Sequence, residues 1–77
     1  MDVHLDKDVA EELIIYKLRR VQGLISDILT RWNETDADSF LRKARDGIYA
    51  EAENDAIELR QLLLEEKKLH ELLDRLS

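Results

Sequence analysis

Near the C-terminal end of the chain, a histidine stands midway between two acidic residues. Glu66, His70 and Asp74 follow one another at intervals of four residues, so a helix would place their side chains on one face. Imidazole and carboxylate groups are common metal ligands, and this spacing is compatible with a metal site. Bundles that bind two metal ions instead repeat Glu-x-x-His on two helices. Because that motif is absent, we interpret the three side chains as surface i, i+4 pairs and predict no metal.

Other patterns that could carry chemistry are incomplete. Glu71 and Asp74 form a single Glu-x-x-Asp, whereas a magnesium ion held between helices needs a second acidic pair. Several arginines could bind an anionic substrate inside a bundle, but the many acids offer them surface ion pairs. These are Arg19, Arg20, Arg31 and Arg60. No glycine-rich phosphate loop or Ser-His-Asp pattern occurs. We therefore predict a protein that is not an enzyme and uses no cofactor; a small helical metal- or anion-binding enzyme is an alternative.

The composition favours long helices in a single domain. The 77 residues carry 12 basic and 18 acidic side chains, for a net charge of −6, and 44% of them are hydrophobic. The chain has no proline, no cysteine and only two glycines, which disfavours strand-and-turn folds and disulfide scaffolds. Its acidity disfavours nonspecific binding to nucleic acid or anionic lipid. No apolar run approaches the ~20 residues of a membrane span and no signal peptide is recognised, so we predict a cytoplasmic protein.

The first segment has the apolar period of a long helix over about residues 7–32. Its apolar side chains alternate intervals of four and three residues, which places them in one stripe along a helix. They are Ile14, Leu18, Val21, Ile25, Ile28 and Trp32. Asp6 or Asp8 is suited to the N-cap position. We predict that the helix continues through Gly23, at a cost of about 1 kcal/mol relative to alanine.

A short helix is predicted over about residues 35–46. Thr35 followed by Asp38 matches a capping-box pattern, with aspartate in place of the usual glutamate. Gly47 is suited to the left-handed position that follows the end of a helix. The segment is therefore bounded at both ends by residues that start and stop helices.

A second long helix is predicted over about residues 49–76. Leucines recur there with a heptad period, interrupted by Glu66 in one apolar position. They are Leu59, Leu62, Leu69, Leu73 and Leu76. A start at Asn54 or Asp55, as the N-cap, is the alternative for the first turn.

The four aromatic residues are divided between core and surface. We expect Trp32 and Phe40 to pack in the core, because large apolar side chains are usually buried. Tyr16 and Tyr49 are predicted to project toward a partner surface.

Together these elements predict an all-α protein in which two long antiparallel helices are joined by a short one. Each apolar stripe is wider than one neighbouring helix covers, and a core of this size is marginally stable. We therefore predict a homodimeric helical bundle. The predicted core and dimer residues are Ile14, Leu18, Val21, Ile25, Ile28, Trp32, Leu59, Leu62, Leu69 and Leu73. The favoured function is a non-enzymatic interaction or regulatory module with an unidentified partner protein.

Residues 1–33 also resemble the start of a ribbon-helix-helix repressor. Residues 3–13 read as a short strand, an acidic cap and a first helix, and Ser26-Asp27-Ile28 stands where that family opens its second helix. The resemblance implies that residues 3–5 pair with a second chain, that the first helix breaks near Gly23, and that the dimer binds DNA. Many such proteins are antitoxins, so residues 35–77 would then form a toxin-binding helical tail.

Overall fold

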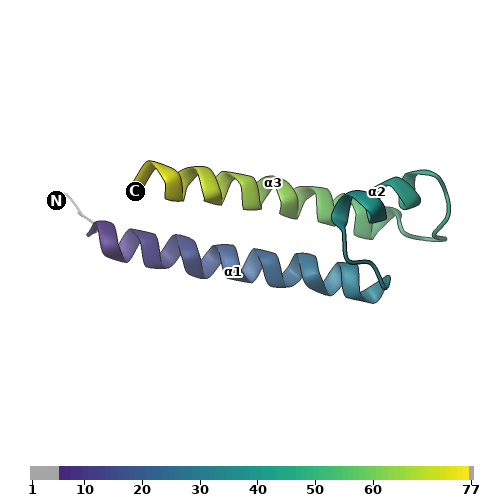
Figure 1. Ribbon diagram of the computed structural model, residues 1–77, viewed down its shortest axis with the longest axis horizontal. Helices are drawn as coiled ribbons and strands as arrows, with labels where there is room; N and C mark the ends of the chain where they lie inside the picture. Colours follow the sequence, from purple (N-terminus) through teal and green to yellow (C-terminus); the bar gives the residue numbers. More distant parts are fainter. Residues whose placement is uncertain (1–5, 77) are drawn as a thin grey trace.

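A helical hairpin with a short third helix at its turn is the architecture of the computed structural model, which describes residues 6–76. The helices are α1 (Lys7–Arg31), α2 (Ala37–Arg45) and α3 (Glu53–Leu76). Figure 1 shows α1 and α3 side by side along their length, with α2 against α3 at the end where the chain turns. The described residues contain no strand, which confirms the all-α prediction. None of these helices is both long and apolar enough to cross a membrane.

Ion pairs between the long helices show their antiparallel register. Lys17 Nζ lies 3.2 Å from Glu65 Oε1 near the middle of the hairpin. Arg31 Nη1 lies 2.8 Å from Asp55 Oδ2 at the turn end. Residue numbers therefore rise along α1 as they fall along α3. The hairpin measures 53 × 20 × 18 Å, so it is much longer than it is thick.

The core is a single cluster between the two long helices and α2. Among the described residues, the buried apolar side chains are Leu18, Val21, Ile25, Ile28, Phe40, Ala52, Ala56, Leu59, Leu62 and Leu69. Of the predicted core, Ile14, Trp32 and Leu73 are only half-buried. Ile14 and Leu73 lie toward the end of the hairpin that α2 does not reach, where fewer neighbours surround each side chain. Trp32 lies at the edge of the turn.

The end of α1 has the left-handed stop that helices commonly use. Asn33 has φ of 54°, and its N–H donates to the Thr30 carbonyl over 3.1 Å. The Glu34 N–H donates to the Leu29 carbonyl over 2.8 Å. These two bonds satisfy carbonyls that have no partner inside the helix. α1 is continuous through Gly23, as the apolar period predicts, and has no break there.

The structure describes the predicted start of α1 but not the predicted N-terminal strand. Asp6 occupies the N-cap position, although its side chain makes no capping hydrogen bond. The strand that the ribbon-helix-helix resemblance implies over residues 3–5 lies outside the described residues.

The capping prediction for α2 is wrong by one residue at its start and right at its end. Asp36, rather than Thr35, is the N-cap, and its carboxylate accepts the Ser39 N–H over 3.2 Å. Gly47 has φ of 77°, as predicted for a residue that ends a helix. Its N–H donates to the Ala44 carbonyl and that of Ile48 to the Lys43 carbonyl, over 3.3 and 3.0 Å. This pair of bonds is a Schellman motif.

The predicted start of the third helix at residue 49 is also wrong, because α3 begins at Glu53. Glu51 has φ of 59°, in the left-handed region, which a helix cannot pass through. The alternative start, with Asn54 or Asp55 as the cap, is wrong by two or three residues, since Ala52 precedes the helix. Glu53 and Asp55 lie in the first turn, where carboxylates stabilise the positive end of the helix dipole.

Candidate interaction surface

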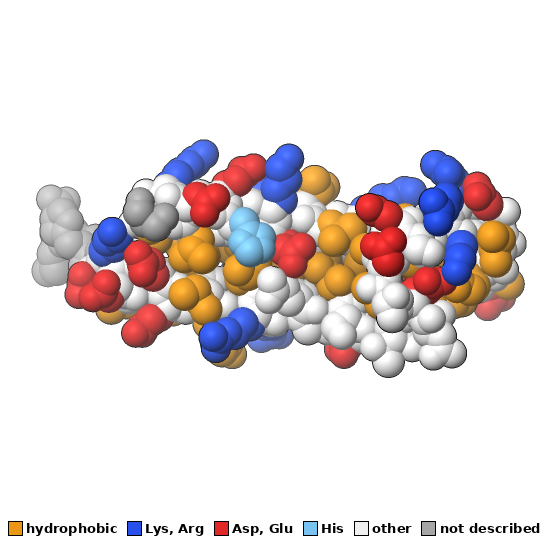
Figure 2. Space-filling view, in the orientation of Figure 1, with side chains coloured by type: hydrophobic (Ala, Val, Ile, Leu, Met, Phe, Trp, Pro, Cys, Tyr) orange, Lys and Arg blue, Asp and Glu red, His pale blue; other side chains and the backbone are white. Residues whose placement is uncertain are grey.

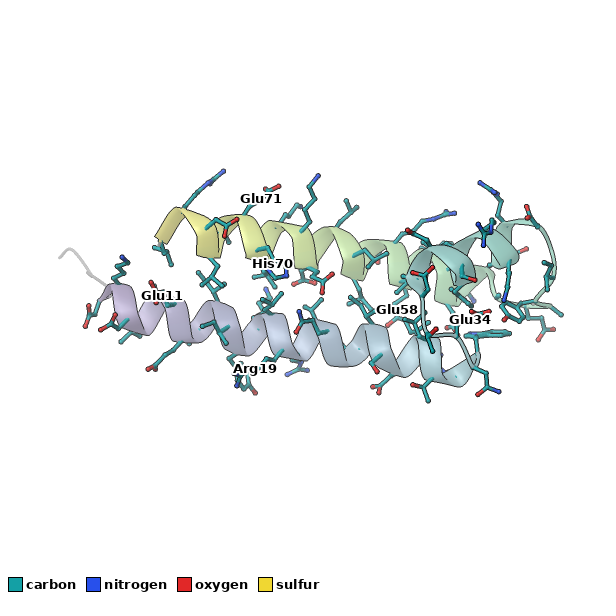
Figure 3. The ribbon with its side chains drawn as sticks, viewed as in Figure 1. Glu11, Arg19, Glu34, Glu58, His70 and Glu71 are labelled. Atoms are coloured by element: carbon teal, nitrogen blue, oxygen red, sulfur yellow. The ribbon has the colours of Figure 1, made fainter. Side chains whose placement is uncertain are left out.

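The predicted histidine cluster lies on the exposed part of α3. His70 is exposed and lies at the edge of α3 nearest α1, whereas Glu71 points away from α1 (Figure 3). Figure 2 shows His70 over the seam between the long helices, beside apolar side chains. Within residues 6–76, no group of three or more histidine and acidic side chains is placed to hold a metal ion. Glu66, His70 and Asp74 are thus not brought together as a metal site in this part of the chain.

The arginines are distributed among different places rather than gathered in one site. Arg31 is bound by Asp55. Arg19 points away from α3 (Figure 3). Arg60 lines a shallow depression with Arg45 and Glu53, between α2 and α3. Arg19, Arg31 and Arg60 are therefore not gathered in one pocket.

The turn end of the hairpin is held by a polar cluster on Asp55, whose carboxylate accepts two hydrogen bonds. Trp32 Nε1 and Arg31 Nη1 each donate to Asp55 Oδ2 over 2.8 Å. The bond from Trp32, then the bond and charge of Arg31, hold the pKa of Asp55 below its usual value. This cluster ties the last turn of α1 to the first turn of α3.

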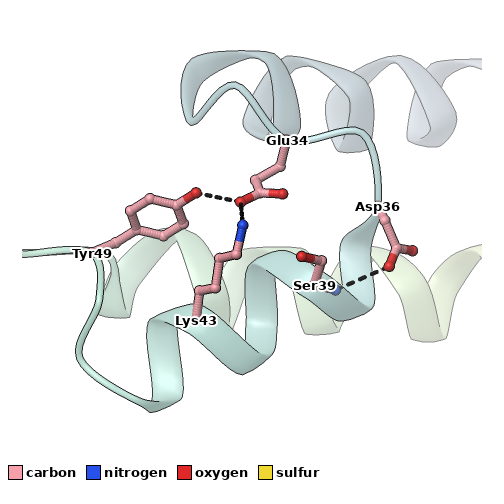
Figure 4. A network of polar contacts seen from close by, with 5 residues as sticks. All are labelled: Glu34, Asp36, Ser39, Lys43 and Tyr49. Atoms are coloured by element: carbon pink, nitrogen blue, oxygen red, sulfur yellow. Dashed lines mark hydrogen bonds and ion pairs between the residues drawn. The ribbon is translucent and has the colours of Figure 1, made fainter.

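A second cluster joins the α1–α2 connection to α2 and the following loop (Figure 4). Lys43 Nζ donates to Glu34 Oε1 over 2.7 Å, and the Tyr49 hydroxyl donates to the same oxygen. The Lys43 bond, followed by the Tyr49 bond, lowers the pKa of Glu34, and Glu34 in turn raises the pKa of both donors. The bonds fix the path of both loops around α2.

Aromatic rings fill the space between these two polar clusters. The ring centroids of Trp32, Phe40 and Tyr49 lie 5.1 to 5.8 Å apart, within the range of favourable aromatic pairs. Phe40 is completely buried. Tyr49 is half-buried here, so the prediction that it projects toward a partner is wrong, whereas Tyr16 is 70% exposed. No buried polar side-chain atom of the described residues lacks a partner. The turn end is therefore a structural unit in which the buried polar side-chain atoms all have hydrogen-bond partners.

One long side of the hairpin carries apolar side chains that no other described residue covers. Two rows with helical intervals of three and four residues run along it, one on each long helix. The α1 row comprises Leu13, Lys17, Arg20, Leu24 and Asp27, and the α3 row comprises Glu58, Gln61, Glu65, Lys68, Leu72 and Arg75. We name this surface the Lys17 side, because the Lys17–Glu65 ion pair joins the two rows. A groove here is lined by Lys17 together with Leu64, Leu69 and Leu72.

The leucines of the Lys17 side are the site that the sequence analysis missed as a surface. Leu13 is 56% exposed, Leu24 40%, Leu64 61% and Leu72 43%. Leu13 and Leu24 lie beside the predicted apolar stripe of the first helix rather than in it, and Leu64 lies outside the predicted heptad of the third. Leu13, Leu24 and Leu72 stand about a quarter turn from the core stripe of their helix, and Leu64 stands nearly half a turn from it; this offset is the signal that distinguishes them.

No protein-family model matches this chain, and neither a curated protein nor a solved structure matches it.

Proposed function

We propose that this protein is a non-enzymatic helical interaction module that acts as a homodimer, in which each chain buries its Lys17 side against the other. The observation that carries the proposal is the set of exposed leucines on both long helices. Leu13 and Leu24 lie in the α1 row of the Lys17 side, and Leu64 and Leu72 of α3 line its groove. Four such side chains on one side of a small protein favour an interface over isolated surface residues.

The shape of the chain supports the same proposal. Its radius of gyration is 15.8 Å, against about 11.5 Å for a compact domain of this length. Its accessible surface is 6091 Å², against about 4,900 Å² for a compact monomer of 9.1 kDa. The excess of roughly 1,200 Å² exceeds the ~800 Å² that each partner buries in a standard interface.

The leucines supply the driving force. Burying a leucine completely is worth about 1.5–3 kcal/mol, and these four side chains are about half exposed in the single chain. Each therefore gains about 1 kcal/mol on dimerisation. The free energy gained on dimerisation is twice that of one chain, because a two-fold dimer buries the same surface on both chains.

Sedimentation equilibrium tests the proposal. We expect the wild-type protein to be a dimer at micromolar concentration, and Leu13→Glu or Leu64→Glu to be a helical monomer. Ile48→Glu is the matched control, because Ile48 is 65% exposed but lies in the loop between α2 and α3. A wild-type monomer that is fully folded would overturn the proposal, as would a dimer that survives both leucine substitutions.

A further inference from the structure

We infer that ionic strength regulates the homodimer: the net negative charge of the two copies opposes their association, and salt that screens this charge tightens the dimer. This regulation rests on the proposed homodimer and adds the condition that controls how much of it forms. Each chain carries 12 basic and 18 acidic side chains, for a net charge of −6 at pH 7. Two copies of such a chain repel each other at long range, and a net charge far from zero keeps proteins monomeric.

The Lys17 side is a part of the surface where this charge is almost balanced. Four of the 12 bases lie in its two rows, but only three of the 18 acids. The bases are Lys17, Arg20, Lys68 and Arg75, and the acids are Asp27, Glu58 and Glu65. Two copies that meet here therefore do not press one acidic surface onto another. The repulsion between them comes mainly from acids elsewhere on the chain.

The attractive contacts available on the Lys17 side depend less on salt. Its exposed leucines are uncharged, and the burial of apolar surface is not an electrostatic interaction. The ion pair between Lys17 and Glu65 is already formed within the single chain, over 3.2 Å, so association does not create it. Exposed ion pairs that the remaining charges form across the interface contribute little. Long-range repulsion is therefore the electrostatic contribution that salt changes most.

The width of the hairpin sets the range of salt over which the repulsion acts. Its two short dimensions are 20 and 18 Å, so the charges of two stacked copies lie roughly 20 Å apart. The Debye length is ~30 Å at ~0.01 M salt and ~8 Å at ~0.15 M. The two copies therefore repel each other across the interface at the lower concentration and are largely screened at the higher one.

Sedimentation equilibrium of the wild-type protein in sodium chloride tests the regulation. We expect the dimer dissociation constant to fall on the order of tenfold or more between ~0.01 M and ~0.15 M salt. A dissociation constant that stays unchanged or rises would overturn the inference and leave the homodimer in place. A folded monomer at both salt concentrations would instead refute the homodimer itself.

Charge variants outside the Lys17 side separate the effect of net charge from that of local contacts. Arg19 and Glu71 are exposed and lie outside both rows; Arg19 points away from α3, and Glu71 points away from α1 (Figure 3). Glu71→Lys changes the net charge from −6 to −4, so the dimer should tighten on the order of tenfold at ~0.01 M salt. Arg19→Glu changes it to −8 and should weaken the dimer by a similar factor. Both variants should approach wild type at ~0.15 M salt.

The double variant Arg19→Glu/Glu71→Lys is the matched control, because its net charge is again −6. It should have the dissociation constant of wild type at both salt concentrations. Circular dichroism should show the same helix content in all four proteins. Single variants that match wild type at ~0.01 M salt, or a double variant that differs from it, would show that local contacts control the dimer and would overturn the inference.

Discussion

Replacing Gly23 by alanine should stabilise the protein. Gly23 lies in the interior of α1, eight residues before its end. An alanine Cβ at this position would meet no other atom within 4 Å, so the substitution adds no steric conflict. Glycine loses more backbone freedom on folding than alanine does, which costs a helix about 0.5–1 kcal/mol. The substitution recovers this free energy without changing any contact.

The expected gain is measurable by thermal unfolding. For a chain of this size, about 0.5–1 kcal/mol corresponds to an increase in Tm of roughly 2–8 °C. Far-UV circular dichroism follows the helices, and wild type and variant should be compared at one protein concentration, because dimerisation makes Tm depend on concentration.

Gly47→Ala is the matched control, with the opposite sign. A Cβ at Gly47 also meets no atom within 4 Å, but the residue has φ of 77°. Alanine there costs about 1–2 kcal/mol through backbone conformation alone. A lower Tm in Gly23→Ala would refute the continuous helix and favour a turn near this residue. Salt-dependent binding of that protein to duplex DNA would then support the ribbon-helix-helix alternative.

Further outcomes follow from the core and from the turn end. Ile25→Ala should lower the free energy of unfolding by about 2–5 kcal/mol in urea titrations, because the side chain is buried between α1 and α3. Phe40→Ala should cost about 3–5 kcal/mol and alter the fluorescence of Trp32, the sole tryptophan, whose ring centroid lies 5.7 Å away. The lowered pKa of Glu34 stabilises the fold at neutral pH and ceases to do so as pH falls through that pKa, so Glu34→Gln should flatten the acid limb of a Tm–pH profile. The raised pKa of Tyr49 stabilises the fold below its usual pKa and this is lost as pH rises through the raised value, so Tyr49→Phe should flatten the alkaline limb. Limbs identical to wild type in both variants would contradict this account of the turn end.

The apolar period predicts α1 and the body of α3, because the position of a residue around its helix largely decides whether it is buried between two helices. Val21, Ile25 and Ile28 are buried where the intervals of four and three place them. Gly47 is equally recognisable, since few other residues adopt its backbone conformation. Signals of this kind act through one turn of helix, so they need no knowledge of the rest of the chain.

Features that depend on the path of the loops were not predictable in this way. Thr35 and Asp36 are both good N-cap residues, and the left-handed Asn33 decides which of them reaches the start of α2. Tyr49 reaches Glu34 across 15 residues from a loop in which Glu51 takes a left-handed conformation before α3 begins. Choosing these partners from the sequence requires the three-dimensional arrangement that they help to build.

The hairpin is three helices thick at its turn and two helices thick toward residues 7 and 76, and this asymmetry has a dynamic consequence. Amides near Ile28 and Leu59 are enclosed by a third helix and by the aromatic cluster, whereas those near Ala10 and Leu73 are not. Local opening should therefore start at the thin end, and hydrogen exchange should slow progressively toward the turn. A second copy bound along the Lys17 side would slow the exchange of amides most strongly at the end that α2 does not cover. Dimerisation would therefore be seen as a smaller difference in exchange rate between the two ends of the hairpin.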